Sequence, residues 1–259
     1  MDSLESLFSL RGHVGLVTGA SSGLGVECAW ALAIGGADVA LVARRADRLE
    51  KLAGDLRKLG IRALPIPADV RIDEELDRVV ATAAAELGEV DILVNNAGIS
   101  PTGRAEKMTR EAWDSTLAVN LTAPMMLSQR VGRRLIEAKK PGRIINMGSI
   151  QSIIASGVYR MVAYAAAKAA LANVTRQLAV EWADYGINVN AIAPGWIPTE
   201  ATELGLTKPS NKERMELFTP MGRLGRPEEI RGAVIFLASP AASYVTGALV
   251  CVDGGYTAW

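Results

Sequence analysis

The stretch VGLVTGASSGLG, residues 14–25, decides the fold. Its first five residues form an apolar run that predicts a strand buried on both faces. Gly19, Gly23 and Gly25 then mark a turn, and a helical pattern opens at Leu24. Glycines allow a backbone to approach a pyrophosphate, and a helix N-terminus favours its negative charge. The spacing is not the standard G-x-G-x-x-G, so a glycine-rich turn without a ligand remains the plainer alternative.

Outward from this stretch, strand-like and helix-like segments alternate along the chain. Further strands are expected at residues 38–43, 63–67, 91–95, 143–147, 187–192 and 248–252, and helices at 24–35, 48–59, 73–87, 111–138, 163–185 and 227–238. This alternation predicts an α/β fold with a doubly wound, seven-stranded parallel sheet and helices on both faces. No repeat or linker interrupts it, so residues 1–259 are expected to form a single domain.

One stretch departs from the alternation. Residues 199–219 are polar and irregular in pattern, and they follow the carboxyl end of an expected strand. Loops at this edge of a sheet commonly cover substrates. We therefore expect a substrate lid at about residues 199–219.

Charge and composition argue against several classes of protein. Lys plus Arg number 28 and Asp plus Glu number 28, so the formal net charge is zero. A nucleic-acid-binding protein normally shows a basic excess, so no nucleic-acid partner is expected. The N-terminus carries Asp2 and Glu5 and lacks the basic region of a secretory signal. No apolar run approaches the ~20 residues of a membrane span.

The cysteines and the single histidine narrow the chemistry. Cys28 and Cys251 both fall in apolar segments, and we expect core thiols in a reducing compartment and hence a cytoplasmic protein. His13 precedes the first strand, whereas catalytic groups in open α/β sheets lie at the carboxyl ends of strands. We expect a surface or turn histidine there. Acid–base chemistry then falls to Tyr, Lys or carboxylates, and no metal is expected.

The segment YAAAK, residues 164–168, offers such a pair. Tyr164 and Lys168 are four residues apart in a helical pattern, so they share one helix face. A neighbouring cation favours a phenolate, so Lys168 is expected to lower the pKa of Tyr164 from its ordinary value near ~10. Without further context, a packed ring and a solvated ammonium would explain the same spacing.

The end of the second expected strand bears on the choice of ligand. About 20 residues past the glycines, a Rossmann unit places the residue that reads the adenosine ribose. An acidic residue would bind the 2′-hydroxyl of NAD, but here Ala43 is followed by Arg44 and Arg45. A guanidinium suits a 2′-phosphate, so NADP(H) is expected, with Arg44 the first choice and Arg45 the second. Two ordinary surface arginines are the alternative.

Two further strand ends carry polar residues. Asp69 and Val70 follow the third strand, where Asp69 could bond an adenine amino group or cap the helix that begins near Ile72. Asn96, Ala97 and Gly98 end the fourth strand in a tight turn that permits close approach to a ligand.

Taken together, these motifs resemble the short-chain dehydrogenase/reductase family over essentially the full chain. The matching segments are TGASSGLG (18–25), NNAG (95–98), Asn120 in the helix 113–121, Ser149 after IINMG, YAAAK (164–168), PGW (194–196) and VDGGY (252–256).

The resemblance implies a role for each matching residue. Tyr164 would be the acid–base group, Lys168 would lower its pKa and bind the nicotinamide ribose, Ser149 would hold the substrate oxygen, and Asn120 would kink its helix and anchor a proton-relaying water. The residues that would line the dinucleotide are Gly19, Ser21, Ser22, Gly23, Leu24, Gly25, Arg44, Arg45, Asp69, Val70, Asn96, Ala97, Gly98, Tyr164, Lys168, Pro194, Gly195, Ile197 and Thr199.

One spacing departs from the family pattern. The family's serine usually lies about thirteen residues before the tyrosine, as the resemblance implies, whereas Ser149 lies fifteen and Ser152 twelve before Tyr164. The match at the strand end favours Ser149 with an insertion after it, and Ser152 remains an alternative.

The expected activity is NADP(H)-dependent interconversion of a ketone and a secondary alcohol. SIQS and INVNAIAPGWIPTEAT resemble gluconate 5-dehydrogenase-type members, which act on sugar acids and polyols, and the overall pattern also resembles 3-oxoacyl carrier-protein reductases. For the latter, Arg130, Arg133 and Arg134 are either a docking patch or a solvated helix face. An apolar pocket is expected from Met125, Met126, Tyr159, Met161, Trp196 and Leu204.

Two further points concern an alternative function and the expected assembly. A non-catalytic NADP(H)-binding regulator could use the same fold, although it would have no need to keep Tyr164 and Lys168 in register. The resemblance also implies a homotetramer that pairs through its long fourth and fifth helices and its C-terminal strand.

Overall fold

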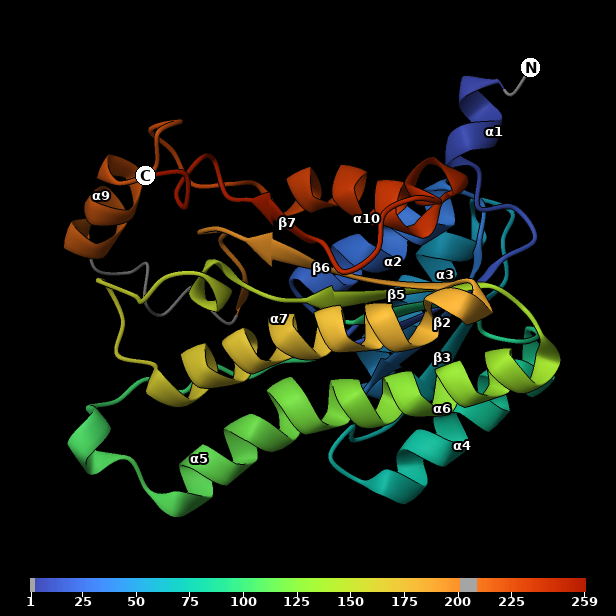
Figure 1. Cartoon of the computed structure of the whole chain (residues 1–259), viewed down its shortest axis with the longest axis horizontal. Coiled ribbons are helices and arrows are strands. Elements are labelled where there is room, and N and C mark those ends of the chain that lie inside the picture. Colours follow the sequence, from blue (N-terminus) through green and yellow to red (C-terminus); the bar gives the residue numbers. More distant parts are fainter. Residues whose placement is uncertain (1–2, 201–208) are drawn as a thin grey trace.

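The computed structural model of the chain describes residues 3–200 and 209–259 (Figure 1). Its centre is one sheet of seven parallel strands in the order β3-β2-β1-β4-β5-β6-β7. The strands are β1 (Val14–Thr18), β2 (Asp38–Ala43), β3 (Ala63–Pro67), β4 (Ile92–Asn95), β5 (Gly142–Met147), β6 (Ile187–Pro194) and β7 (Leu249–Val252). The order reverses between β1 and β4, and in open α/β sheets ligands bind at such a point, outside the carboxyl ends of the strands.

Helices cover both faces of this sheet. One layer holds α2 (Leu24–Ile34), α3 (Ala46–Arg57) and α10 (Arg231–Ala238); the other holds α4 (Asp73–Glu86), α6 (Ala123–Ala138) and α7 (Val162–Trp182). Figure 1 shows α6 and α7 running side by side below the sheet and α10 above it. The expected doubly wound, single-domain Rossmann fold is confirmed.

Neighbouring residues of one strand pack into opposite layers of the core. In β1, Val17 packs into the layer with α2 and α10, whereas Leu16 packs into the layer with α4, α6 and α7. Leu41 and Val42 of β2 repeat this division. Successive side chains of a strand point to opposite faces, so a sheet covered on both sides needs a continuous apolar run. This explains why VGLVT lacks alternation.

The helix bounds agree closely with the sequence pattern, with one informative exception. Residues 111–138 were expected to form one helix, and they form α5 (Arg110–Leu117), a π-helical turn over Ala118–Thr122, and α6. Asn120 lies at the centre of that turn, so the expected kink takes the form of a widened turn. At the other helix ends, 3₁₀ turns over Ala183–Tyr185 and Pro227–Ile230 complete the predicted ranges.

The stretch 199–219 is less irregular than its composition indicated. It contains α9 (Pro209–Leu217), a nine-residue helix whose Met215 is buried. The expectation of an irregular segment is therefore wrong for residues 209–217, where the chain is helical and Met215 packs inward. The part of the expected lid at residues 201–208 lies outside the described residues.

The two cysteines differ. Cys28 is fully buried in α2, and burial raises the pKa of its thiol to about 12. Cys251 is exposed, so the expectation of a second core thiol is wrong. Its strand, β7, forms the edge of the sheet, where the neighbouring layers cover only part of the surface.

His13 lies just before β1, as expected of a turn histidine. Its Nδ1 is 2.7 Å from Asp91 Oδ2, and this hydrogen bond raises the pKa of the imidazole. Among the helices of residues 3–200 and 209–259, none combines the length and the apolar character that a membrane crossing requires.

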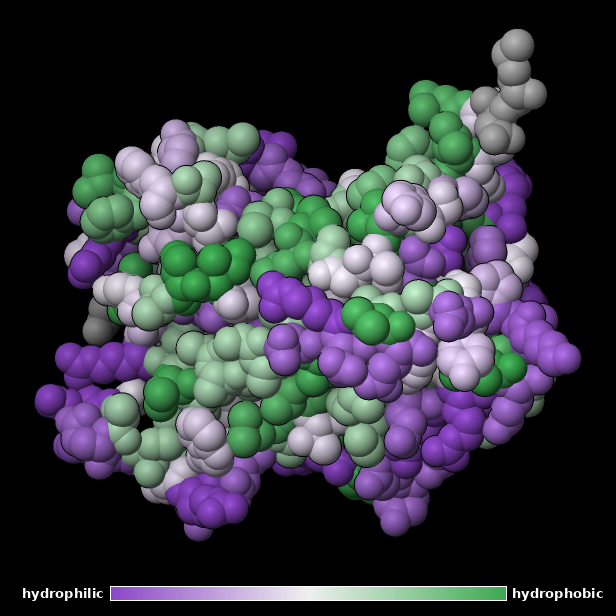
Figure 2. Space-filling view, in the orientation of Figure 1, coloured by the Kyte–Doolittle hydropathy of each residue, from purple (hydrophilic) through white to green (hydrophobic). Residues whose placement is uncertain are grey.

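Near the N-terminus, α1 (Leu4–Phe8) projects from the body of the molecule with Leu4, Leu7 and Phe8 exposed (Figures 1 and 2).

Candidate active site

The turn after β1 owes its shape to glycine. Gly19 has a φ of +68° and Gly23 a φ of +58°, which side chains with a Cβ rarely adopt. Gly25 allows close packing, because a Cβ there would lie 2.2 Å from the Gly19 carbonyl oxygen. Gly23 caps α2 without a side-chain hydrogen bond, and a helix N-terminus without a side-chain cap favours an anion.

A second turn is tied to the first. The Thr18 hydroxyl accepts hydrogen bonds from the backbone N–H groups of Asn96 and Ala97, each at 3.0 Å. The Asn96 side chain donates back to the Thr18 carbonyl at 2.9 Å. The ends of β1 and β4 therefore form one rigid floor.

Above this floor lies a cavity of about 630 Å³, here called the glycine-turn cavity. It brings together nearly all the residues predicted to line a dinucleotide: Gly19, Ser21, Ser22, Gly23, Leu24, Arg44, Arg45, Asp69, Val70, Asn96, Ala97, Gly98, Tyr164, Lys168, Pro194, Gly195, Ile197 and Thr199. Gly25 does not line it and instead packs beneath the turn.

Two arginines lie at one end of the glycine-turn cavity and differ in their contacts. Arg45 donates to Ser21 Oγ at 3.0 Å and to Ser22 Oγ at 2.7 Å, and its guanidinium pairs with Glu200 at 3.2 Å. Within the described part of the chain, the Arg44 guanidinium makes no hydrogen bond or ion pair, and its charge contributes to lowering the pKa of Asp69. A free guanidinium at one end and Lys168 at the other fit a phosphorylated dinucleotide.

Asp69 also lines the glycine-turn cavity, but it caps no helix. Its carboxylate accepts from the backbone N–H and the guanidinium of Arg71, which lowers the pKa of the carboxyl group. The N-cap of α4 is Ile72, which has no side-chain oxygen. The helix-cap alternative is therefore wrong.

At the other end of the cavity, α7 supplies Tyr164 and Lys168. The Lys168 ammonium is buried and donates to the Met147 carbonyl at 2.6 Å. Burial lowers the pKa of Lys168 to about 8. A buried hydrogen bond from Asn146 to the Thr175 hydroxyl at 2.9 Å ties α7 to β5, so both functional side chains are held against the sheet.

The expected lowering of the Tyr164 pKa is wrong for this structure. Burial raises the pKa of the phenol, and a hydrogen bond with Ser149 only partly offsets the rise. The Lys168 Nζ lies 5.5 Å from the centre of the Tyr164 ring and points at a backbone carbonyl, so its charge does little for the phenolate.

The structure separates the two candidate serines. Ser149 lies at the end of β5, lines the cavity, and its Oγ accepts from the Gln151 backbone N–H at 3.1 Å. The Ser152 hydroxyl instead donates to the Lys168 backbone carbonyl at 2.9 Å, next to α7. Ser149 is thus placed beside Tyr164, and Ser152 secures the helix that carries it.

Asn120 is fully buried behind the cavity. Its amide nitrogen donates to the carbonyls of Ile99 at 2.8 Å and Thr116 at 2.9 Å. A Cβ on Gly98 would lie 2.9 Å from Asn120 Oδ1 and 4.0 Å from Lys168 Nζ. Asn120 and Lys168 therefore face a shared gap that only a glycine leaves open.

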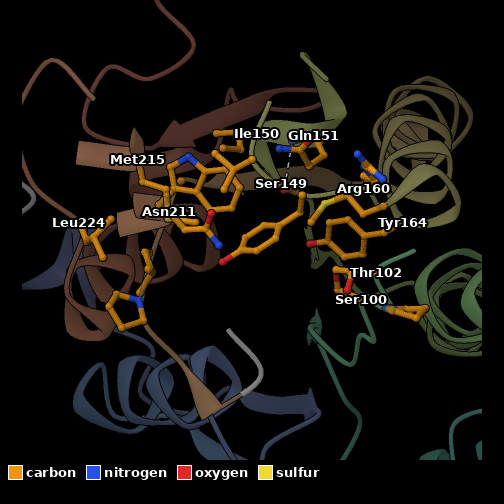
Figure 3. A pocket seen from close by; sticks show the side chains of 18 of the residues that line it. Ser100, Thr102, Ser149, Ile150, Gln151, Arg160, Tyr164, Asn211, Met215 and Leu224 are labelled. Atoms are coloured by element: carbon orange, nitrogen blue, oxygen red, sulfur yellow. Dashed lines mark hydrogen bonds between the residues drawn. The ribbon is translucent and has the colours of Figure 1, made fainter. Parts of the chain in front are cut away.

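A second cavity, of about 780 Å³, adjoins the first and is here called the aromatic cavity (Figure 3). The Trp196 ring packs edge-on against Tyr159 and Tyr256, with ring centres 5.6 and 5.9 Å apart. Ser149 and Tyr164 line both cavities. Met161 lines the aromatic cavity as expected, whereas Met125 and Met126 pack against the core and Leu204 lies outside the described residues.

Several residues of the aromatic cavity have no signal in the sequence pattern. They come from separate parts of the chain, and they include Ser100, Thr102, Gln151, Arg160, Asn211, Met215 and Leu224 (Figure 3). Asn211 reaches the cavity from α9, beside the Tyr159 hydroxyl. Only the position of Gln151, two residues after the matched serine, could have indicated its place.

Comparison with known proteins agrees with this geometry. A family model described as enoyl-(acyl carrier protein) reductase matches residues 19–257. A short-chain type dehydrogenase/reductase from Mycobacterium marinum superposes with a TM-score of 0.94 at 37% identity, over 98% of this chain and 99% of that chain. The chain belongs to the short-chain dehydrogenase/reductase family. It is therefore an oxidoreductase, and its substrate is a small molecule.

Two relatives bear on the chemistry of this short-chain dehydrogenase/reductase. The galactitol 2-dehydrogenase (L-tagatose-forming) of Cereibacter sphaeroides is 42% identical over 98% of this chain and 99% of its own. A gluconate 5-dehydrogenase from Burkholderia cenocepacia, crystallised with NADP and tartrate, superposes with a TM-score of 0.94 at 33% identity, over 99% and 100% of the two chains. Both are named as dehydrogenases, so the non-catalytic regulator finds no support here.

Proposed function

We propose that this short-chain dehydrogenase/reductase uses NADP(H) to interconvert a ketone and a secondary alcohol of the polyol or sugar-acid class. One observation carries the proposal. Ser100, Ser149 and Tyr164 bear the hydroxyl groups that line both the glycine-turn cavity and the aromatic cavity. Of these, Ser149 and Tyr164 are hydrogen-bonded to each other. A coenzyme in the first and a substrate in the second would meet there.

The glycine-turn cavity would hold the coenzyme along its length. The turn at 19–25 would bind the pyrophosphate, Arg44 the 2′-phosphate, and Asp69 and Val70 the adenine. At the far end Tyr164 and Lys168 would bind the nicotinamide ribose, with Ile197 and Thr199 near the carboxamide. Support comes from the position of these residues around one cavity and from the NADP in the Burkholderia enzyme.

When bound, NADPH supplies the hydride. The hydroxyls of Ser149 and Tyr164 would bind the carbonyl oxygen and hold it more strongly as negative charge develops. Tyr164 would donate the proton, and its raised pKa keeps the phenol protonated at neutral pH. Asn120 and Lys168 would hold a proton-relaying water in the gap next to Gly98.

The substrate class is supported by the relatives and by the charge of the aromatic cavity. Arg104 and Arg160 line it, and its lining within the described residues contains no acidic side chain, which suits a neutral or anionic substrate. A carrier-protein substrate has less support. Arg130 pairs with Asp73 and Asp77, and Arg134 pairs with Glu89, so two of the three arginines of the supposed docking patch are already paired with carboxylates.

The test measures NADPH formation from NADP⁺ with galactitol, gluconate and related polyols. Wild type is expected to oxidise at least one of them. Tyr164→Phe should lose about 10²- to 10⁴-fold in kcat while still binding NADPH, because only the proton-transfer group is removed. Tyr185→Phe, at an exposed tyrosine, is the matched control. A Tyr164→Phe enzyme with normal kcat would show that another group moves the proton.

We further propose a homotetramer in a reducing, cytoplasmic compartment. Hydrophobic residues gather along α7 in Figure 2, and Val180 on this helix is 77% exposed, which is consistent with a buried surface between subunits. The exposed, unpaired Cys251 suits a reducing compartment. Sedimentation velocity at micromolar concentration is expected to give a tetramer, and a monomer there would contradict this assembly.

The lid expected at about residues 199–219 also remains a proposal. It is supported by α9, whose Asn211 and Met215 form part of the wall of the aromatic cavity.

A further inference from the structure

The wall of the aromatic cavity contains buried polar atoms without partners. Gln151 is 5% exposed, and within the described part of the chain neither its amide nitrogen nor its amide oxygen has a hydrogen-bond partner. The indole N–H of Trp196 is also buried without a hydrogen-bond partner in that part of the chain. Both residues line this cavity.

Buried polar atoms without a hydrogen-bond partner lower the stability of a protein. An unsatisfied buried polar group lowers stability by about 1–3 kcal/mol, and most buried groups in native proteins have partners. Two buried amides away from the cavities follow that rule: Asn95 donates to Ser128 and Asn146, and Asn190 donates to the Val245 carbonyl. Among the residues that the structure describes, Asn120, in the gap beside Gly98, leaves only its oxygen without a partner, whereas both amide atoms of Gln151 lack one. The free amide of Gln151 therefore reflects its place beside the cavity and not a loosely packed core.

Gln151 lies close to the reacting atoms of the proposed function. Its backbone N–H donates to Ser149 Oγ at 3.1 Å, and Figure 3 shows the two residues next to one another at the cavity wall. Two residues along a chain span at most about 7 Å. The Gln151 amide is thus within reach of a substituent one or two carbons away from the carbonyl that Ser149 would hold. It can turn toward a ligand without breaking a hydrogen bond.

We propose that Gln151, assisted by the Trp196 indole, binds a hydroxyl group on the carbon next to the reacting carbon. The enzyme would then select α-hydroxyketones and vicinal diols over simple ketones and alcohols. This inference rests on the proposed function and adds a specificity residue to it. An amide offers both a donor and an acceptor, so it can satisfy a hydroxyl in either role. A site built to bond a hydroxyl discriminates against an analogue without one.

The test uses two ketones of nearly equal shape, 3-hydroxybutan-2-one and 3-methylbutan-2-one, with NADPH as reductant. The quantity compared is the ratio of their kcat/KM values in wild type and in Gln151→Met. The intrinsic reactivity of each ketone cancels in this comparison. Gln151→Met removes the amide, keeps the size of the side chain and keeps the backbone bond to Ser149. The ratio is expected to fall by on the order of tenfold.

Two further variants complete the design. Gln177→Met makes the same substitution on the exposed face of α7, where Gln177 bonds only Glu181, and should leave the ratio unchanged. Trp196→Phe removes the indole N–H and keeps a ring, and should lower the ratio by a few fold. If Gln151→Met is inactive with both ketones, the ratio measured in Trp196→Phe tests the proposal in its place.

The outcomes separate the two proposals. Should wild type reduce both ketones and the ratio stay constant in Gln151→Met, the role of Gln151 is wrong and the proposed function stands. A wild-type enzyme that reduces neither ketone and oxidises no polyol would overturn the proposed function, and this inference with it.

Discussion

The glycine-turn cavity and the aromatic cavity adjoin, yet they are built in different ways. The first lies over the ends of β1, β2 and β4, and its polar groups are mostly bonded to one another, as Thr18 is to Asn96. The second is assembled from six separate stretches of the described chain and carries the unpartnered amide of Gln151. One cavity is preorganised by backbone, and the other leaves side-chain groups open.

This difference matches the ligand proposed for each cavity. A coenzyme shared by a whole family can be held by glycines and strand ends, which occur as short motifs in the sequence. A substrate that varies within the family has to be selected by side chains on loops. Changes in the first cavity should therefore have large, general effects, and changes in the second should have smaller, selective ones.

The largest effect is expected in the glycine turn. In Gly25→Ala the new Cβ would lie 2.2 Å from the Gly19 carbonyl oxygen, so the turn has to move. A displacement of this order can cost about 10²-fold, and we expect a loss of NADPH affinity of that size, measured by fluorescence titration. Gly54→Ala is the control, since no atom lies within 4 Å of the added Cβ and the variant should be slightly more stable. Normal NADPH binding by Gly25→Ala would contradict a preorganised turn.

A smaller effect is expected at the ribose end. Arg44→Ala should lower the ratio of kcat/KM for NADPH over NADH by about 10- to 100-fold, because charge-assisted hydrogen bonds contribute about 1.5–3 kcal/mol. Arg45→Ala should have a weaker effect on this ratio, since Arg45 is already bonded to Ser21, Ser22 and Glu200.

Arg110→Ala, which breaks only an exposed pair with Asp114, serves as the control for the arginine variants. A wild-type enzyme that uses both coenzymes equally would remove Arg44 from the 2′-phosphate site.

The smallest of these effects concerns stability at the junction of the two cavities. Burial lowers the pKa of Lys168 to about 8, against 10.5 for an ordinary lysine. Between these values the unfolded chain binds a proton that the folded protein does not, so this residue makes stability rise with pH. Lys168→Met should therefore be more stable than wild type at pH 7, by on the order of 1–3 kcal/mol.

The advantage of Lys168→Met should shrink as the pH approaches ~10, which urea unfolding at several pH values would measure. An advantage that does not change with pH would mean that the buried charge is not its source.

Local patterns were sufficient for the sheet and the coenzyme side. The bounds of β1, β2 and β3 follow directly from apolar runs, and the residues expected around the dinucleotide lie together, apart from Gly25 beneath the turn. The surroundings of individual side chains could not be predicted from local patterns in the same way. The exposure of Cys251 depends on its strand lying at the sheet edge, and the raised pKa of Tyr164 depends on burial by many groups.

The aromatic cavity shows the same limit. Gln151 and Asn211 are sixty residues apart in the sequence, and nothing in either segment indicates that they share a wall. Such proximity arises from the tertiary fold, which brings α9 to the wall that the segment after β5 also lines. Motifs therefore predict the reaction of this enzyme better than its substrate.

The π-helical turn over Ala118–Thr122 has a consequence for how this enzyme can change over generations. Such a turn carries one residue more than an ordinary helical turn, and in other proteins it often accompanies function. Deletion of a single residue here is expected to join α5 and α6 into one regular helix and to move the Asn120 amide away from the gap beside Gly98. A lineage that no longer needed the proton relay proposed for Asn120 could lose the extra residue, whereas selection for turnover would retain it.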